Sequence, residues 1–280
     1  MSATDVGSTD EQKAYEDILS QEISQALSEL NRSTEGLFLS GLSAGLDIGF
    51  GPLLMAVMAT LLTGALGEPV TELLMANIYA IGFIFVILGR SELFTEHTTL
   101  AVLPVLDQQA SLSQLGRLWG IVYAGNILGG IIFAGFAVVV GPATGLINSA
   151  AFTDIASSLT DHSLLVLIAS GVFAGWLMGL LSWLVTAAQE TISRIFFVWL
   201  IASTIGFAHL PHCIAGNVEV LLGLFASSKI TFVDYGRFLV GATAGNVIGG
   251  TVFVALLKYG HVVRGGQESR GEPNESFDVR

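Results

Sequence analysis

The chain has 280 residues, of which 52% are hydrophobic and only 12% are charged, whereas soluble domains are about one quarter charged. Its formal net charge of −12 excludes a nucleic-acid-binding protein, because such proteins present basic surfaces. The single cysteine, Cys213, excludes an internal disulfide framework, and the composition as a whole indicates an integral membrane protein.

Residues 1–35 form a polar and acidic segment. It contains no basic start followed by an apolar stretch, so we expect no signal peptide here. Ile23, Leu27 and Leu30 recur on one helical face, which predicts an amphipathic helix packed on the membrane-facing rim of the protein. A helix that binds a partner protein is the alternative. The expected domains are an acidic cytoplasmic segment, a transmembrane pore domain and a polar cytoplasmic tail, residues 1–35, 36–260 and 261–280.

Six apolar regions follow, and a helix of about 20 apolar residues crosses about 30 Å of hydrocarbon. Lys and Arg are concentrated in the segments on the same side as the N-terminus. The positive-inside rule therefore places both termini in the cytoplasm of a multi-pass protein of the plasma membrane. The six regions are residues 37–63, 70–105, 117–141, 163–187, 195–226 and 236–259.

The third and sixth regions repeat one another. "GRLWGIVYAGNILGGIIF" at residues 116–133 aligns without a gap to "GRFLVGATAGNVIGGTVF" at residues 236–253. The pattern G-x-x-A-G-x-x-x-G likewise recurs at residues 41–49 and 171–179. Three spans per half are an odd number, so the halves cross the membrane in opposite directions, with a substrate path between them. We therefore predict an all-α membrane protein with six transmembrane helices in a 3+3 inverted repeat.

Polar residues interrupt the second and fifth regions. "GRSELFTEHTT" at residues 89–99 follows a long apolar run, and the fifth region carries His209, Pro211 and His212 in its middle. Proline removes a helical hydrogen bond and favours a break. By the symmetry of the repeat we expect both helices to be broken at membrane depth, where irregular backbone must line a cavity or be buried in protein. The alternative for residues 89–99 is an ordinary loop outside the membrane.

These stretches resemble the signatures of the formate/nitrite transporter family. "LGRSELFT" resembles its second-span loop, "GFAHLPH" its Gly-Phe-x-His motif in the broken fifth span, and "AGNILGG" and "AGNVIGG" its Gly-Asn-x-x-Gly motifs in spans three and six. The resemblance covers about residues 37–260. It implies an aquaporin-like protomer with broken helices 2 and 5 and a homopentamer with one pore per subunit. It also implies transport of small monovalent anions or their acids, such as formate, nitrite, hydrosulfide or short carboxylates.

The resemblance also implies a substrate pathway, with His209 at the place of the family's central pore histidine. Histidine donates a hydrogen bond or a proton near neutral pH, so a weak acid that meets it between apolar gates can cross the dry part as a neutral molecule. A buried structural histidine bonded to freed backbone is the alternative for His209, and more strongly for His212 and His97. The expected pathway residues are His209, Thr95, Leu93, Phe94, Phe207 and His212.

The chain departs from the well-studied members of the family at three places. Ala208 replaces an acid before the histidine, Gly175 replaces an asparagine of span four, and no Lys or Arg lies between Arg117 and Arg194, where those members carry a lysine. These departures resemble the YfdC-like branch of the family. They leave the transported species open.

Charged residues at the first break are expected to fix its loop. Arg90 is the cation that we place there, and an unpaired charge at membrane depth is very costly, so it needs an acid. We expect Arg90 to bond at least one of Glu92, Glu96 and Asp47 and to support the loop that presents Thr95. Intramembrane acids are functional candidates by default, but for Asp47 and for Glu219 helix-packing or subunit-contact roles are open alternatives.

Two rival classes are weaker. A metal-ion transporter would use imidazole and thiolate ligands, which suit zinc or copper, but the spacing matches no recognised ligand set. An intramembrane hydrolase lacks support, because Ser91 and Ser203 stand outside any nucleophile-elbow context. We therefore expect a transport protein and not an enzyme, with no cofactor, no metal and no nucleic-acid partner. The residues of the metal alternative are His209, His212, Cys213, Glu92 and Glu96.

Overall fold

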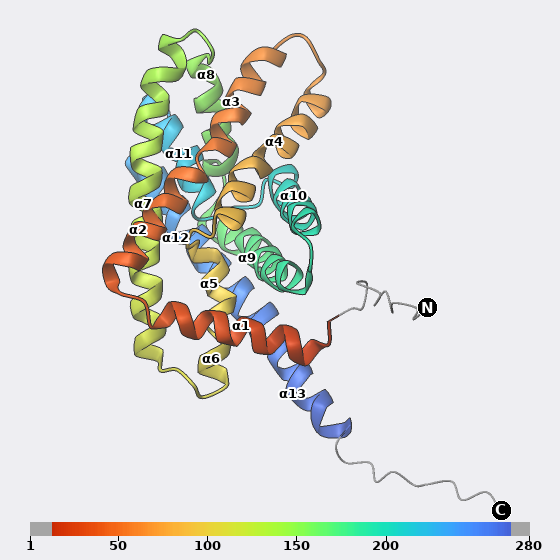
Figure 1. Ribbon diagram of the computed structural model, residues 1–280. Helices are drawn as coiled ribbons and strands as arrows, with labels where there is room; N and C mark the ends of the chain where they lie inside the picture. The colour runs from red at the N-terminus through yellow and green to blue at the C-terminus, as the bar shows by residue number, and fades with distance from the viewer. Residues whose placement is uncertain (1–12, 270–280) are drawn as a thin grey trace, which may run out of the picture.

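The computed structural model describes residues 13–269, and within them every regular element is helical (Figure 1). Residues 1–12 of the expected acidic segment and 270–280 of the expected tail lie outside the described residues. The elements are α1 (Tyr15–Leu30), α2 (Thr34–Asp47), α3 (Phe50–Leu62), α4 (Glu68–Gly89), α5 (Phe94–Leu100), α6 (Leu103–Leu106), α7 (Leu112–Ala143), α8 (Ser149–Thr160), α9 (Leu164–Ala187), α10 (Thr191–Phe207), α11 (Ala215–Ala226), α12 (Phe232–Ile248), the π-helical η1 (Gly249–Leu256) and α13 (Leu257–Ser269).

Five described segments are long and apolar enough to cross a membrane. They correspond to predicted regions one, two, three, four and six, the first being α2 and α3 in series and the last α12, η1 and α13 up to Val263. The fifth region is divided between α10 and α11, which have 17 and 12 residues and are apolar but shorter. The chain is therefore a multi-pass membrane protein of the predicted all-α class. The last helix, α13, spans Leu257–Ser269 and so crosses the expected boundary between residues 260 and 261.

Capping side chains begin several of these spans. Ser111 and Gln114 form a reciprocal capping box at the start of α7, and Thr231 and Asp234 form another at the start of α12. Each box satisfies backbone N–H groups that have no partner inside the helix. The two boxes stand at equivalent positions of the third and sixth spans, so the repeat extends to the helix ends.

The second and fifth spans are broken where the sequence predicts it. α4 ends at Gly89, and the next residue, Arg90, has a left-handed backbone with φ 56°. In the other half α10 ends at Phe207, and His209 follows with φ 48°. After each left-handed residue the next backbone N–H reaches back to the helix, from Ser91 to the carbonyl of Val86 (3.1 Å) and from Leu210 to that of Ile205 (3.0 Å). Both breaks thus use the same type of helix C-terminus.

Small residues let the spans of each half pack closely, α2 against α7 and α9 against α12. A Cβ atom added to Gly129 would overlap the carbonyl oxygen of Leu42, and one added to Gly249 would overlap that of Val172. Glycine is required there because the backbones approach within the space that a methyl group would fill. Four glycines of the repeated motifs lie at such close contacts between helix backbones. They are Gly125, Gly129, Gly245 and Gly249.

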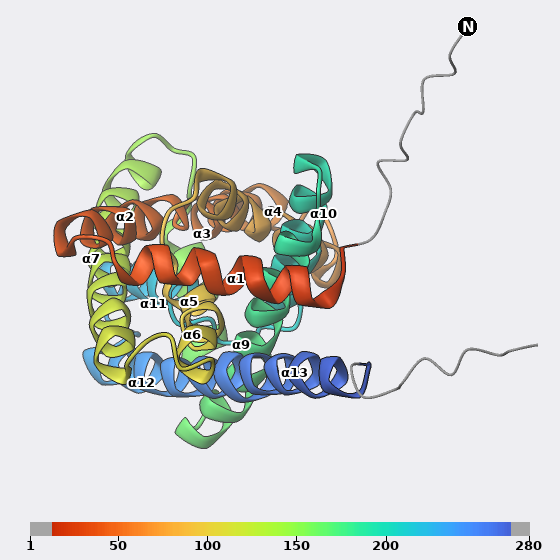
Figure 2. The ribbon, with the colours of Figure 1, turned by 60° about the horizontal axis from the view of Figure 1, so that its bottom comes forward.

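α1 lies across one end of the bundle, beside α13 (Figures 1 and 2). Its apolar stripe faces the protein: Ile23 and Leu30 are buried, as the amphipathic pattern predicts. Two acids are buried on the same face, Glu22 and Glu29. The Lys13 ammonium donates a hydrogen bond to the carbonyl of Thr186 (2.7 Å), which joins the start of α1 to the end of α9. α1 therefore covers one end of the helix bundle of its own chain.

Candidate functional site

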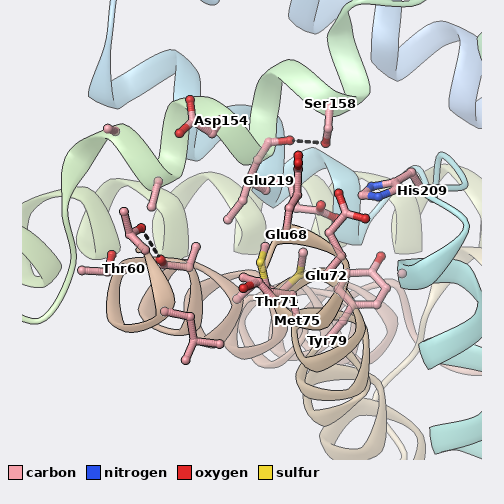
Figure 3. A pocket seen from close by; sticks show the side chains of 18 of the residues that line it. Thr60, Glu68, Thr71, Glu72, Met75, Tyr79, Asp154, Ser158, His209 and Glu219 are labelled. Carbon is pink, nitrogen blue, oxygen red and sulfur yellow. Dashed lines mark hydrogen bonds between the residues drawn. The ribbon is translucent and has the colours of Figure 1, made fainter. Parts of the chain in front are cut away.

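Two cavities open towards opposite ends of the bundle. The distal cavity, far from α1, has a volume of about 880 Å³ and lies among α3, α4, α8, α10 and α11 (Figure 3). The proximal cavity, beside α1, has a volume of about 680 Å³ and lies among α1, the first break, α9 and α10. α4 lines both, with Tyr79 in the distal and Ile87 in the proximal cavity. Eight residues of helix rise about 12 Å, so a short barrier separates the two cavities.

The barrier is built from the two helix breaks. Leu93 of the first break is buried, as are Phe94 and Thr95 in the following first turn of α5 and His212 of the second break. A hydrogen bond of 2.8 Å between Thr95 Oγ1 and His212 Nε2 joins the breaks across the interface of the two halves. The buried ring of Phe83 in α4 meets the His212 ring edge to face, with 5.0 Å between the centroids. Polar groups at the centre of the barrier therefore stand between apolar walls.

Backbone contacts fix the orientation of His212. Its Nδ1 accepts hydrogen bonds from the backbone N–H groups of Ile214 (3.3 Å) and Ala215 (3.1 Å). An Nδ1 that accepts carries no proton in the neutral ring, so Nε2 carries it and donates to Thr95 Oγ1. The hydroxyl hydrogen of Thr95 is then left to donate to a third group. His212 also caps the start of α11, so the structural role considered for this histidine is present together with its contact to Thr95.

The structure differs from the expectation at His209 and Phe207. His209 lines the distal cavity, and it is His212, three residues later, that meets Thr95. Phe207 is 56% exposed and does not line the cavity. The cause is the left-handed turn at His209, which ends α10 early and leaves Pro211 and His212 to run back towards the barrier. The expected pathway residues Leu93, Phe94, Thr95 and His212 come together, whereas His209 and Phe207 lie apart from them.

The expected pairing of Arg90 is wrong. Its side chain is exposed at the proximal cavity, and none of the hydrogen bonds or ion pairs of the described residues includes it. Glu92 is bound instead by the guanidinium of Arg32, from the link between α1 and α2. The reason is the left-handed C-cap, which turns Arg90 away from the buried loop. Asp47 does contact the break, because the Ser91 hydroxyl donates to its carboxylate (3.5 Å).

A buried acid–base cluster lies between the first break and α1. The His97 ring stands between two carboxylates, with Nε2 at 2.6 Å from Glu92 and Nδ1 at 3.3 Å from Glu29. Glu96 lines the proximal cavity beside it. Glu22 and Glu29 belong to α1, which lies outside the membrane spans. Burial raises the pKa of Glu29 above its usual value, and it raises the pKa of Glu22 to about 7. The sequence pattern missed Glu29 and Arg32, because the direction in which α1 docks has no local signal.

Within residues 13–269, the five side chains of the metal alternative do not form a group that could share an ion. Among the described residues, the group of ligand-type side chains close enough to share an ion is Glu29, Glu92 and His97. His97 Nε2 meets Glu92 at 2.6 Å and Nδ1 lies 3.3 Å from Glu29, and Glu92 also binds Arg32, so these side chains form an ion-pair network. The ring nitrogens of His212 are likewise taken.

Asn126 and Asn246 hold the breaks in equivalent ways. The Asn126 amide donates to the carbonyls of Gly41 and Glu92 (both 2.8 Å) and accepts from the N–H of Phe94 (2.9 Å). The Asn246 amide donates to the carbonyls of Gly171 (2.9 Å) and Pro211 (2.8 Å) and accepts from the N–H of Cys213 (2.8 Å). Each asparagine satisfies backbone groups that the break leaves without helical partners. The two Ala-Gly-Asn motifs marked the repeat in the sequence, but nothing in their pattern specified these contacts.

Comparison with known proteins gives relatives along nearly the whole chain. The family described as formate/nitrite transporter matches residues 16–260. The inner membrane protein YfdC of Escherichia coli K12 is 33% identical over 241 residues, which cover 84% of this chain and 74% of YfdC. The nitrite transporter NirC of Salmonella typhimurium is 26% identical over 79% of this chain and 81% of its own. The solved structure of a pentameric formate channel with formate bound superposes with a TM-score of 0.73 at 25% identity, covering 82% of this chain and 98% of that one.

Proposed function

The chain belongs to the formate/nitrite transporter family, and from this membership and the barrier geometry we propose that it is a membrane pore for small monovalent anions or their conjugate acids. The hydrogen bond between Thr95 and His212 carries the proposal, because it places two hydrogen-bonding side chains in the barrier between two cavities. Formate, nitrite, hydrosulfide and short carboxylates are the substrates that we infer. NirC is named as a transporter and the superposed structure as a channel, so we infer that the chain is not an enzyme.

The physical basis of the proposal is the cost of dehydration. An ion that leaves water for a narrow apolar passage loses its hydration, which is prohibitive unless hydrogen bonds or a proton replace it. The free hydroxyl hydrogen of Thr95 can donate a hydrogen bond to an anion, while the oxygen of that hydroxyl accepts a hydrogen bond from His212 Nε2. Leu93, Phe94 and Phe83 keep the passage dry, which favours a weak acid that crosses as the neutral molecule. Arg90 and Asp47 line or support the approach and stand outside the barrier itself.

We also propose an assembly, from a superposed structure, and an orientation, from the distribution of Lys and Arg. A formate channel that superposes on this chain is pentameric, and we propose a homopentamer in which each subunit has its own pore. The distribution of Lys and Arg supports cytoplasmic termini, so that the proximal cavity faces the cytoplasm and the distal cavity faces outward. The metal-ion alternative has no support from the relatives.

Flux into proteoliposomes tests the proposal with a matched pair of histidines. We expect the wild-type protein to carry formate or another small weak acid. His212→Ala should lower that flux or change its pH dependence, whereas His209→Ala, in the distal cavity, should retain the wild-type profile. Absence of flux for every small acid tested, or identical profiles for both variants and the wild type, would contradict the proposed pore.

A further inference from the structure

The lining of the distal cavity contains several acids but no described lysine or arginine. Four carboxylates belong to it, and none of the described residues that line it is a lysine or an arginine. Figure 3 shows Glu68, Glu72 and Glu219 turned towards the same space, with His209 at its edge and Asp154 on the facing helix. These acids come from three elements, α4, α8 and α11, so the charge surrounds the cavity.

No described residue neutralises these carboxylates through an ion pair. Arg237 and Lys229, which belong to this end of the bundle, do not line the cavity. Arg237 donates to the carbonyl of Thr160 (2.6 Å) and to Asp234 (3.1 Å), and Lys229 lies in the loop before α12, outside the cavity lining. The negative charge of the cavity is therefore available to act on whatever enters it.

Glu219 differs from the other three acids in its burial. Only 6% of it is exposed, whereas Glu68 and Glu72 at the rim and Asp154 on α8 are exposed. It lies on α11 and interacts with the buried Tyr79 of α4, one helical turn before Phe83, whose ring contacts His212. Glu219 thus occupies the inner end of the cavity, next to the barrier.

The lining of the proximal cavity contains both positively and negatively charged side chains. Arg32, Arg90 and Arg194 line it together with three glutamates, and the side chain of Arg90 has no protein partner among the described residues. An anion that approaches the barrier through the proximal cavity therefore meets positive charge, and one that approaches through the distal cavity does not. The two ends of the pore treat charge differently.

We propose that the distal cavity is a charge filter that excludes anions, with Glu219 as its innermost specificity-determining residue, so that from this side the pore accepts a weak acid only as the neutral molecule. This inference rests on the proposed pore function and specifies the protonation state in which the substrate enters the pore. It assigns a role to Glu219, for which the sequence left functional and packing roles open.

The physical argument concerns both species of the substrate. Carboxylates in a cavity enclosed by protein create a field that repels an anion, and such fields change the rate of approach by about 10- to 1000-fold. The neutral acid carries no net charge, and its O–H donates a hydrogen bond to a carboxylate, which the anion cannot do. Glu219 thereby repels the anion and accepts a hydrogen bond from the neutral acid.

The test compares two anions of similar size from the distal side. Formate is in equilibrium with its neutral acid, whereas nitrate is the anion of a strong acid and stays charged. Vesicles are sorted by a C-terminal affinity tag, because the described C-terminal helix α13 lies at the proximal end. Those that leave the tag inside expose the distal cavity. We expect wild-type uptake of formate to follow the concentration of the neutral acid, and nitrate uptake to be slower by about tenfold or more.

The variants then locate the filter. Glu219→Gln should raise the ratio of nitrate uptake to formate uptake about tenfold. The triple change Glu68→Gln, Glu72→Gln and Asp154→Asn affects only exposed acids, so it carries the test even where Glu219→Gln fails to fold. Asp161→Asn, at the exposed end of α8 and outside the cavity lining, is the matched control and should change neither rate.

Two results would overturn the filter: wild-type protein that admits nitrate as fast as formate, or a ratio of the two rates that neither the single nor the triple variant changes. Failure of the pore proposal has a different signature, since no weak acid would then cross in the wild-type protein from either side.

Discussion

Thr95 and His212 show how two residues from opposite halves make one functional unit. Thr95 lies in the first turn of α5, directly after the first break, and His212 lies in the second break; both are buried, so neither exposes its polar atoms to lipid. The backbone N–H groups of Ile214 and Ala215 decide which nitrogen of His212 carries the proton. That choice in turn leaves the hydrogen of the Thr95 hydroxyl free to meet a substrate. The chemistry of the pair thus depends on backbone that belongs to the start of α11.

Thr95→Val should lower weak-acid flux by about tenfold or more. Valine has nearly the volume of threonine, but it removes the hydroxyl and leaves the His212 N–H buried without an acceptor, which costs about 1–3 kcal/mol. Flux and thermal unfolding of the purified protein measure the two effects. Thr204→Val is the control, because Thr204 is exposed and bonds only its own helix. Wild-type flux in Thr95→Val would show that the hydroxyl takes no part in transport.

At the scale of the element, α1 is attached to the bundle partly through buried acids. Glu22 has no exposed surface, and one of its oxygens accepts a hydrogen bond from the Ser182 hydroxyl of α9 (3.0 Å), with Lys258 as the charged neighbour that lowers its pKa. Burial outweighs these contacts and raises the pKa of Glu22 from 4.5 to about 7. Docking therefore favours the protonated carboxyl.

The attachment of α1 should weaken as the pH rises. The docked pKa of Glu22 exceeds that of the free helix, so its contribution is fully present below about 4.5 and is lost as the pH rises through about 7. Hydrogen exchange of the α1 amides should be slower at about pH 5 than at about pH 8.5, after correction for the intrinsic exchange rate. Glu22→Gln should remove this difference, whereas Glu16→Gln, on the exposed side of α1, should keep it. Equal protection at both pH values in the wild type would contradict a titrating contact.

At the scale of the whole molecule, the two halves repeat the same contacts. α2 meets α7 through glycines in one half, and α9 meets α12 through glycines in the other. The symmetry is not complete, because the last span contains η1, a π-helical stretch that the third span lacks. The Thr99 hydroxyl of α5 donates to the carbonyl of Gly250 in that stretch (2.9 Å), so the irregular turn is matched to a side chain of the other half.

Gly129→Ala and Gly249→Ala should destabilise the protein by similar amounts, about 1–3 kcal/mol, because an added methyl group overlaps a backbone carbonyl oxygen in each case. Gly135→Ala lies on the same helix as Gly129 and has nothing within 4 Å of the added atom, so it should be neutral or slightly stabilising. Unfolding in detergent, followed by temperature, compares the three variants. A Gly135→Ala variant as unstable as Gly129→Ala would show that helix geometry, and not close packing, explains the loss.

The features that the sequence predicts correctly are those with a repeated or compositional signal. Apolar length marked the spans, and the gapless recurrence of Ala-Gly-Asn marked the two halves and hence the broken helices. The side chains that meet at the barrier are harder to predict from the sequence. "HLPH" contains two histidines, and the left-handed turn at the first of them has no reliable local sequence pattern. The partner of Glu92 was missed for a related reason. Arg32 is 60 positions away along the chain, and only the docked position of α1 and its link brings it near.

The contacts of the two asparagines also have a consequence for the order in which the spans can enter the lipid during synthesis. Asn126 supplies the hydrogen bonds of the first break from 32 to 34 positions later in the chain, and Asn246 does so for the second from 33 to 35 positions later. Until the ribosome has delivered each asparagine, the exposed backbone of the preceding break has no protein partner, and several kcal/mol per group oppose its release into lipid. The insertion machinery must therefore shelter spans two and five until spans three and six arrive. Each half is expected to leave the translocon as a set of three helices.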